Sequence, residues 1–144
     1  MIHTRVLMIE TPTFSHFVKN IVHRASCGVE IIGATADAGS ILELINRYQP
    51  DVLIVDIRNA SSGTFELLMK IRSENPYAQI IGRTKKPAYQ FMLQVIGVGV
   101  MGFVNDQTPF NELIDAIGAV GSGYAYLPQN LASQFVQGLQ YQPS

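Results

Sequence analysis

The sequence predicts a doubly wound α/β domain, in which a five-stranded parallel sheet is covered by helices on both faces. The chain has 144 residues, 47% of them apolar, which suits one domain with a sizeable core. Short runs rich in Val and Ile lack the strict alternation of half-exposed strands, as is typical of strands buried inside a parallel sheet. Segments with helical spacing separate these runs, and such alternation predicts the α/β class.

The predicted strands are five apolar runs of two to four residues: 6–9, 29–32, 52–55, 80–81 and 102–104. Turn-forming pairs support two of their boundaries. Pro50 and Asp51 precede the third run, and Asn75 and Pro76 precede the fourth. We therefore expect the third and fourth strands to begin directly after a turn.

The predicted helices lie between and after these runs, because their apolar residues recur at intervals of three and four. The residues that carry this spacing are Phe14, Phe17, Val18, Ile21 and Val22; Ile41, Leu44, Ile45 and Tyr48; Leu67, Leu68 and Ile71; Phe91, Leu93, Val95 and Ile96; and Leu113, Ile114, Ile117 and Val120. We expect Thr108 to cap the fifth helix and Pro109 to occupy its first turn.

The chain divides into an α/β domain at 1–127 and a linker or short C-terminal helix at 128–144. The division follows a break at 121–123, after which Leu131, Phe135, Val136 and Leu139 carry helical spacing. This last segment could dock on its own domain, lead to a further domain, or pair with a second copy.

Composition excludes several classes of function for this segment. The formal net charge is −1 and the charged residues are scattered, so no basic stripe exists for nucleic acid or an anionic membrane. The chain contains neither a secretory signal nor an apolar run long enough to span a bilayer. Cys27 is the only cysteine, which agrees with a reducing compartment. We expect a soluble cytoplasmic protein.

Candidate functional residues follow the predicted strands, because ligands of open parallel sheets collect at the carboxyl ends of the strands. They are Glu10, Thr11, Asp56, Thr84, Asn105 and Asp106. Asp56 ends the third strand, where a carboxylate can act as nucleophile toward a phosphoryl group if a divalent cation and a lysine neutralise the phosphate oxygens. The alternative is a carboxylate that caps a helix or orders a loop.

From 5 to about 126, the chain resembles the receiver domain of bacterial two-component response regulators. Two motifs carry the resemblance, Arg5-Val-Leu-Met-Ile-Glu-Thr11 and Pro50-Asp-Val-Leu-Ile-Val-Asp56, and Gly99-Val-Met-Gly-Phe103 adds to it. The segment 123–128 is similar to the branch whose receivers precede a LuxR-type helix-turn-helix. The resemblance implies the flavodoxin-like receiver fold, Asp56 as phospho-acceptor, and Thr84 and Phe103 as switch residues. Phe103 is equally well explained as core.

The pocket departs from the family pattern at two charged positions. Thr11 replaces the second of the family's two adjacent carboxylates. Asp106 aligns with the family's lysine after the fifth strand, or Asn105 does if the alignment is shifted by one residue. Glu10, Asp56 and the backbone carbonyl of Arg58 would then hold Mg²⁺ weakly or not at all. If Asp106 faces the pocket, its charge is expected to raise the pKa of Asp56.

Other basic residues lie near the expected pocket. Lys85 follows Thr84 directly and can occlude the pocket; alternatively, Lys85 or Lys86 turns inward and replaces the missing cation, or both stay solvated. The Arg58 side chain can pair with Asp56 and hold the pocket in one state.

Three functions remain. The first is an atypical receiver that acts in signal transduction and transcriptional regulation by dimerising or by docking an output domain, without phosphorylation. The second is a working phospho-acceptor that receives a phosphoryl group on Asp56 from a histidine kinase. A third possibility is that the altered pocket binds a small ligand. The sequence has no phosphate-loop, dinucleotide-binding or nucleophile-elbow motif, so we do not expect an enzyme.

The family resemblance implies a homodimer, with a helix-turn-helix output domain outside this chain. The expected contact surface is either the fourth helix, fifth strand and fifth helix, or the first and fifth helices. Phe14, Met92 and Phe110 are the apolar residues that we expect to find exposed there.

Overall fold

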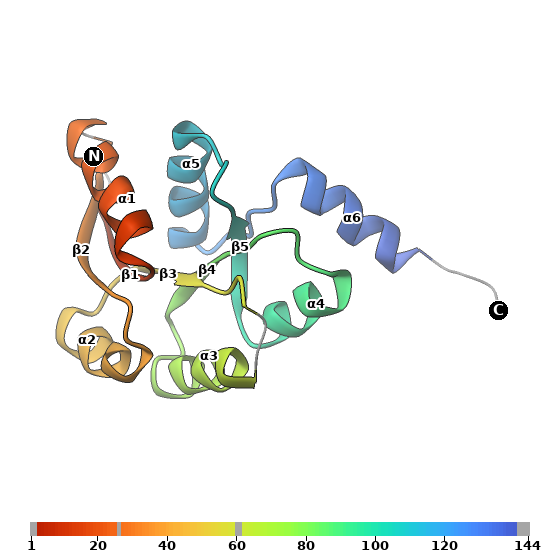
Figure 1. Ribbon diagram of the computed structural model, residues 1–144, viewed down its shortest axis with the longest axis horizontal. Helices are drawn as coiled ribbons and strands as arrows, with labels where there is room; N and C mark the ends of the chain where they lie inside the picture. The colour runs from red at the N-terminus through yellow and green to blue at the C-terminus, as the bar shows by residue number, and fades with distance from the viewer. Residues whose placement is uncertain (1–2, 26, 60–61, 141–144) are drawn as a thin grey trace.

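The computed structural model describes residues 3–25, 27–59 and 62–140, so the last residues of the segment 128–144 lie outside the described part (Figure 1). The elements, in order, are β1 (Thr4–Ile9), α1 (Pro12–Ala25), β2 (Val29–Thr35), the short 3-10 helix η1 (Ala38–Ser40), α2 (Ile41–Tyr48), β3 (Val52–Asp56), α3 (Ser62–Glu74), β4 (Gln79–Arg83), α4 (Tyr89–Gly97), β5 (Val100–Val104), α5 (Phe110–Gly121) and α6 (Gln129–Leu139).

The five strands form one parallel sheet in the order β2-β1-β3-β4-β5, which confirms the predicted fold class. The chain first winds from β1 outward to β2, and then returns across β1 to β3. The strand order therefore reverses between β1 and β3, and a crevice forms at such a switch point beyond the carboxyl ends of the strands. Glu10 and Asp56 follow or end these two strands.

Alternate strand residues form two apolar layers, because successive side chains of a strand point to opposite faces of the sheet. Leu7 and Leu53 belong to the layer that packs on α2, α3 and α4, whereas Val6 and Val52 belong to the layer that packs on α1 and α5. Figure 1 shows α1 and α5 on one side of the sheet and α2, α3 and α4 on the other. Strands β1, β3, β4 and β5 are largely buried on both faces, as their apolar runs predict. The edge strand β2 is only partly buried, so the prediction of a buried strand is wrong for the run 29–32.

The C-terminal helix α6 docks on α4 of its own domain. Residues before it extend the sheet edge, since the Phe103 amide donates to the Tyr126 carbonyl at 3.0 Å and a parallel bridge joins Gly102 to Tyr126. Leu131 of α6 is 5% exposed and belongs to the same apolar cluster as Met92. The expectation that Met92 is exposed is wrong, because Met92 is 0% exposed in this apolar cluster, while Phe14 and Phe110 are partly buried.

The start of α5 also differs from the expected cap. The N-cap position is Pro109, and its side chain makes no capping bond. Thr108 instead uses its hydroxyl to accept the Asn105 amide at 2.9 Å and orders the preceding loop. Among the described residues, no helix combines the length and apolar character needed to cross a bilayer.

Candidate functional site

Strand register brings the charged residues of the site together at one edge of the sheet. Asp56 on β3 pairs with Arg83 on β4, and Ile9 on β1 pairs with Val55 on β3, which places Glu10 beside Asp56. Asp106 reaches the same edge from the loop after β5. Four neighbouring strands thus contribute three carboxylates and one guanidinium group.

Arg83 is the centre of the site. Its side chain is 1% exposed, and it holds Glu10 in a bidentate ion pair, with Nε 2.8 Å from Oε2 and Nη2 2.6 Å from Oε1. Its Nη1 bonds to Asp106, and its Nη2 lies 3.5 Å from Asp56 Oδ2. The ring of Phe14 lies under the guanidinium carbon, which is 4.1 Å from the ring centroid. A charge this deeply buried is tolerated because each nitrogen has an acidic partner.

Asp56 is held from its other side by Arg58. The Arg58 side chain donates to both carboxylate oxygens, from Nε to Oδ1 and from Nη2 to Oδ2, at 2.9 Å each. The Arg58 amide adds a bond of 3.1 Å to Oδ1. The ion pair between Arg58 and Asp56, which the sequence analysis gave as one possibility, is thus present in the structure.

The two arginines change the expected charge state of Asp56. Burial by itself raises the pKa of Asp56, but the bonds from Arg58 and the charge of Arg83 outweigh burial, so the pKa lies below its usual value. The expectation that Asp106 raises the pKa of Asp56 is therefore wrong, because Arg83 neutralises the Asp106 carboxylate and also attracts Asp56. Burial raises the pKa of Glu10, and its bonds to Arg83 oppose this effect.

The residues expected to hold Mg²⁺ do not fit a magnesium site. Both oxygens of Glu10 bond to Arg83, and both oxygens of Asp56 bond to Arg58. Thr11 caps α1 instead of facing a metal, since its hydroxyl accepts the Phe14 amide at 3.3 Å. Nowhere in the described residues do three or more His, Cys, Asp or Glu side chains form a group able to hold a metal ion.

The remaining predicted residues lie around this cluster. Lys85 and Lys86 are exposed on the loop after β4, and the carboxylates of the site are bonded by Arg83 and Arg58. Thr84 is 2% exposed and bonds to Val104 through its amide, at 2.8 Å. Asn105 is partly buried, and its side chain accepts the Gln107 amide at 2.8 Å.

Phe103 is buried in the apolar core. It is 1% exposed and lies in the cluster that contains residues of α3, α4 and α6. This position agrees with the interpretation as core.

Arg83 is the functional residue that the sequence analysis missed. Its position in the sequence could have indicated it, because Arg83 directly follows the apolar run 80–82 and precedes the candidate residue Thr84. A long basic residue at the end of a central strand lies at the same sheet edge as Glu10 and Asp56.

The sequence profile described as the response regulator receiver domain matches residues 6–118. This chain belongs to the response regulator receiver domain family. The receiver domain is 24% identical over 123 residues to the Fimbriae Z protein of Salmonella typhimurium, which covers 85% of this chain and 58% of that relative. It is 27% identical over 111 residues to the DNA-binding transcriptional activator EvgA of Escherichia coli K12, which covers 77% of this chain and 54% of that relative. The chain thus spans little more than half the length of these two curated relatives.

Two solved structures support the fold of the receiver domain. A LuxR-family two-component response regulator from Aurantimonas sp. superposes with a TM-score of 0.83 at 23% identity, covering 94% of this chain and 97% of that one. The isolated receiver domain of RcsB from Salmonella enterica, in the presence of the phosphomimetic BeF3−, superposes with a TM-score of 0.76 at 18% identity. The match covers 92% of this chain and 98% of that one. At these identities the likeness shows the fold alone.

Proposed function

We propose that this receiver domain takes part in transcriptional regulation as a binding module that works without phosphorylation of Asp56. The observation that carries the proposal is the Arg58 side chain, which lies 2.9 Å from each Asp56 oxygen. A carboxylate attacks a phosphoryl group through an open oxygen, with free cations nearby to neutralise the phosphate oxygens. Here both oxygens are bonded, and Arg83 is already committed to Glu10 and Asp106.

A specific observation keeps phosphorylation as the second candidate function. The pKa of Asp56 is lowered, so the carboxylate is ionised at neutral pH, and two guanidinium groups lie beside it. Guanidinium groups bind phosphate oxygens well. If they released Asp56, they could bind and neutralise the oxygens of a phosphoryl group on it. In that case the partner would be a histidine kinase.

Intact mass after incubation with acetyl phosphate and Mg²⁺ tests the proposal, with Asp56→Asn as the control. We expect no mass gain in the wild-type chain, provided that its thermal unfolding shows a folded sample. A gain of one phosphoryl group that Asp56→Asn lacks would establish the second candidate and overturn the first.

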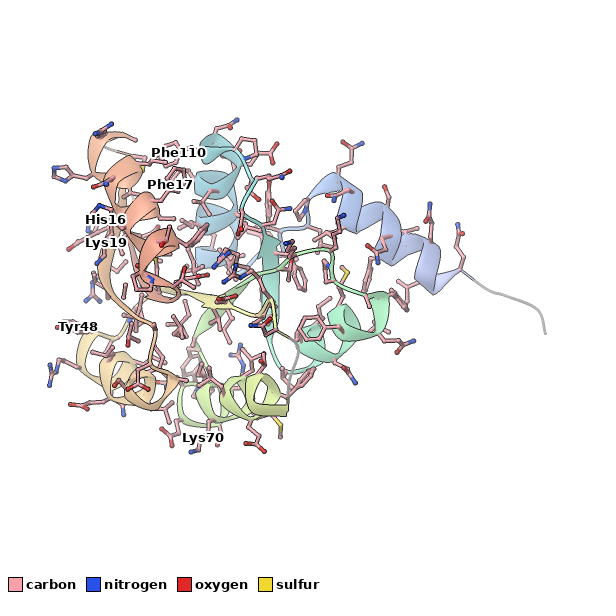
Figure 2. The ribbon with its side chains drawn as sticks, in the orientation of Figure 1. His16, Phe17, Lys19, Tyr48, Lys70 and Phe110 are labelled. Atoms are coloured by element: carbon pink, nitrogen blue, oxygen red, sulfur yellow. The ribbon has the colours of Figure 1, made fainter. Side chains whose placement is uncertain are left out.

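The proposed module acts as a homodimer, and we favour the face formed by α1 and α5. The alternative face, around α4 and β5, is partly covered by α6, where Phe135 packs on Tyr89 with ring centroids 5.8 Å apart. On the free face, Phe17 is 55% exposed, and Figure 2 shows it on α1 beside Phe110 of the neighbouring helix α5.

Charge supports a second copy as the occupant of this face. The exposed titratable residues of α1 are basic: His16, Lys19, His23 and Arg24. Those of α5 are acidic, Glu112 and Asp115. A two-fold arrangement that sets α1 of one copy against α5 of the other pairs opposite charges twice.

Sedimentation equilibrium at increasing chain concentration tests the dimer. We expect Phe17→Ser to weaken association, and Tyr77→Ser to leave it unchanged, since Tyr77 is 92% exposed outside α1 and α5. A wild-type chain that stays monomeric at high micromolar concentration would contradict the dimer.

The module would pass its state to a helix-turn-helix output domain, because the curated relatives that this chain covers only in part include transcriptional regulators. We propose that this segment itself contacts neither nucleic acid nor membrane and catalyses no reaction. A cytoplasmic location is part of the proposal, and the free thiol of Cys27 agrees with it.

A further inference from the structure

We infer that Arg83 is the resident cation of the pocket and takes the place of a divalent metal ion. The inference rests on the receiver-type pocket of the proposed function, but not on whether Asp56 is phosphorylated. It assigns the charge balance of the site to a side chain of the protein, so that the pocket needs no cofactor.

The position of Arg83 is the first argument. Its guanidinium group lies among carboxylates that come from the ends of three other strands, Glu10 after β1, Asp56 on β3 and Asp106 after β5. Arg83 contacts all three, and its side chain is 1% exposed. This is the place where a cation neutralises the most negative charge at this sheet edge.

The use of the carboxylate oxygens is the second argument. Mg²⁺ needs oxygen ligands at about 2.0–2.1 Å in a nearly octahedral arrangement. Both Glu10 oxygens instead bond to Arg83, at 2.8 and 2.6 Å, and Arg83 Nη2 is 3.5 Å from Asp56 Oδ2. A metal ion bound to these oxygens would either displace the guanidinium group or lie next to its positive charge.

The restraint on Arg83 is the third argument. The ring of Phe14 covers one face of the guanidinium group, with the centroid 4.1 Å away. The Arg83 backbone is fixed in β4, where its carbonyl accepts the Ile57 amide at 3.0 Å. Because an arginine stays protonated at all ordinary pH values, this cation neither dissociates nor titrates.

Metal titration of the wild-type chain is the direct test. We expect the midpoint of thermal unfolding to stay within about 1 °C between a chelator and about 10 mM Mg²⁺, whereas ligand binding at well above its Kd shifts the midpoint by several degrees. Saturable stabilisation by Mg²⁺ that Asp56→Asn abolishes would overturn the inference.

A gain of metal binding provides the second arm. Thr11→Asp restores an acidic residue and keeps a good helix cap, and Arg83→Thr removes the resident cation. We expect the combined variant to bind Mn²⁺ saturably by electron paramagnetic resonance. Thr11→Asp alone, and Thr11→Asp with Arg47→Thr at an exposed arginine, should not bind it. A folded combined variant that gains no Mn²⁺ binding would also overturn the inference.

The outcomes separate this inference from the proposed function. Phosphoryl uptake by Asp56 that is the same with chelator and with Mg²⁺ would contradict the proposed function and leave Arg83 as the resident cation. Saturable Mg²⁺ binding without phosphoryl uptake would overturn the inference alone.

Discussion

Asp56 and Arg83 are register partners at the ends of β3 and β4, and Arg83 Nη2 lies 3.5 Å from Asp56 Oδ2. Two cations therefore lie beside Asp56: Arg83 from the neighbouring strand, and Arg58 from the loop after β3. Gly82 contributes to this arrangement, because a Cβ at this position would lie 2.4 Å from Ile57 Cδ1. Its absence lets Ile57, the residue after Asp56, pack against β4 while Arg83 turns into the site.

Arg83→Met should destabilise the chain by about 3 kcal/mol, because removing one partner of a buried ion pair leaves carboxylates uncompensated. Urea unfolding at neutral pH measures the loss. Arg47→Met is the matched control, with an expected change below about 0.5 kcal/mol, since the pair of Arg47 with Glu43 is exposed. Equal midpoints for Arg83→Met and the wild type would contradict a stabilising role for the cluster.

Arg58→Gln should raise the pKa of Asp56. The Arg58 side chain supplies two of the bonds that favour the ionised carboxylate, and a neutral amide favours it less. Carboxyl ¹³C chemical shifts followed against pH measure the change, with Arg47→Gln as the control. An unchanged pKa would mean that Arg83 and the Arg58 amide alone set the charge state of Asp56.

The fold could be predicted because its signals are local or periodic. The apolar runs and helical spacing place each strand and helix, and the order β2-β1-β3-β4-β5 agrees with the family resemblance. Met92 and Thr108 were misjudged for a different reason. Whether Met92 is buried depends on how α4 packs in the folded domain, and the bond of Thr108 depends on the shape of the loop at Asn105.

The site could be predicted only in part. Glu10, Asp56 and Asp106 follow from their places after predicted strands, but the charge state of Asp56 depends on which side chains reach it in space. From the sequence, Asp106 adds an unpaired negative charge, because the spacing of residues does not show that Arg83 lies against it in space. The direction of the long Arg58 side chain likewise could not be fixed by sequence spacing.

Stability should depend on the ionisation of Asp56 in acid. The folded-state pKa of Asp56 is lowered, so its contribution is fully present above its unfolded pKa of about 3.9 and is lost as the pH falls through the folded value. Asp56→Asn should therefore cost about 1–2 kcal/mol at pH 7, and its difference from the wild type should shrink below about pH 4. Unfolding free energies of both chains across this range measure the effect, and a constant difference would contradict it.

Gly138→Ala should loosen α6 without affecting the sheet. A Cβ at Gly138 would lie 2.4 Å from Tyr89 Cε2, so either the tyrosine ring or the last turn of α6 must move. Amide hydrogen exchange should become faster in α6, while β1 and β3 keep their protection.

Gly118→Ala in α5 is the matched control, because the added Cβ would meet no atom within 4 Å apart from its chain neighbours and the nearby backbone of α5. It should stabilise α5 by about 0.5–1 kcal/mol through helix propensity and leave exchange in α6 unchanged. Slower exchange in α6 of Gly138→Ala would contradict the prediction. The contact with Tyr89 would then not limit docking, and α6 would be held by Leu131 and by the bond of 3.2 Å from Gln134 to the Pro87 carbonyl.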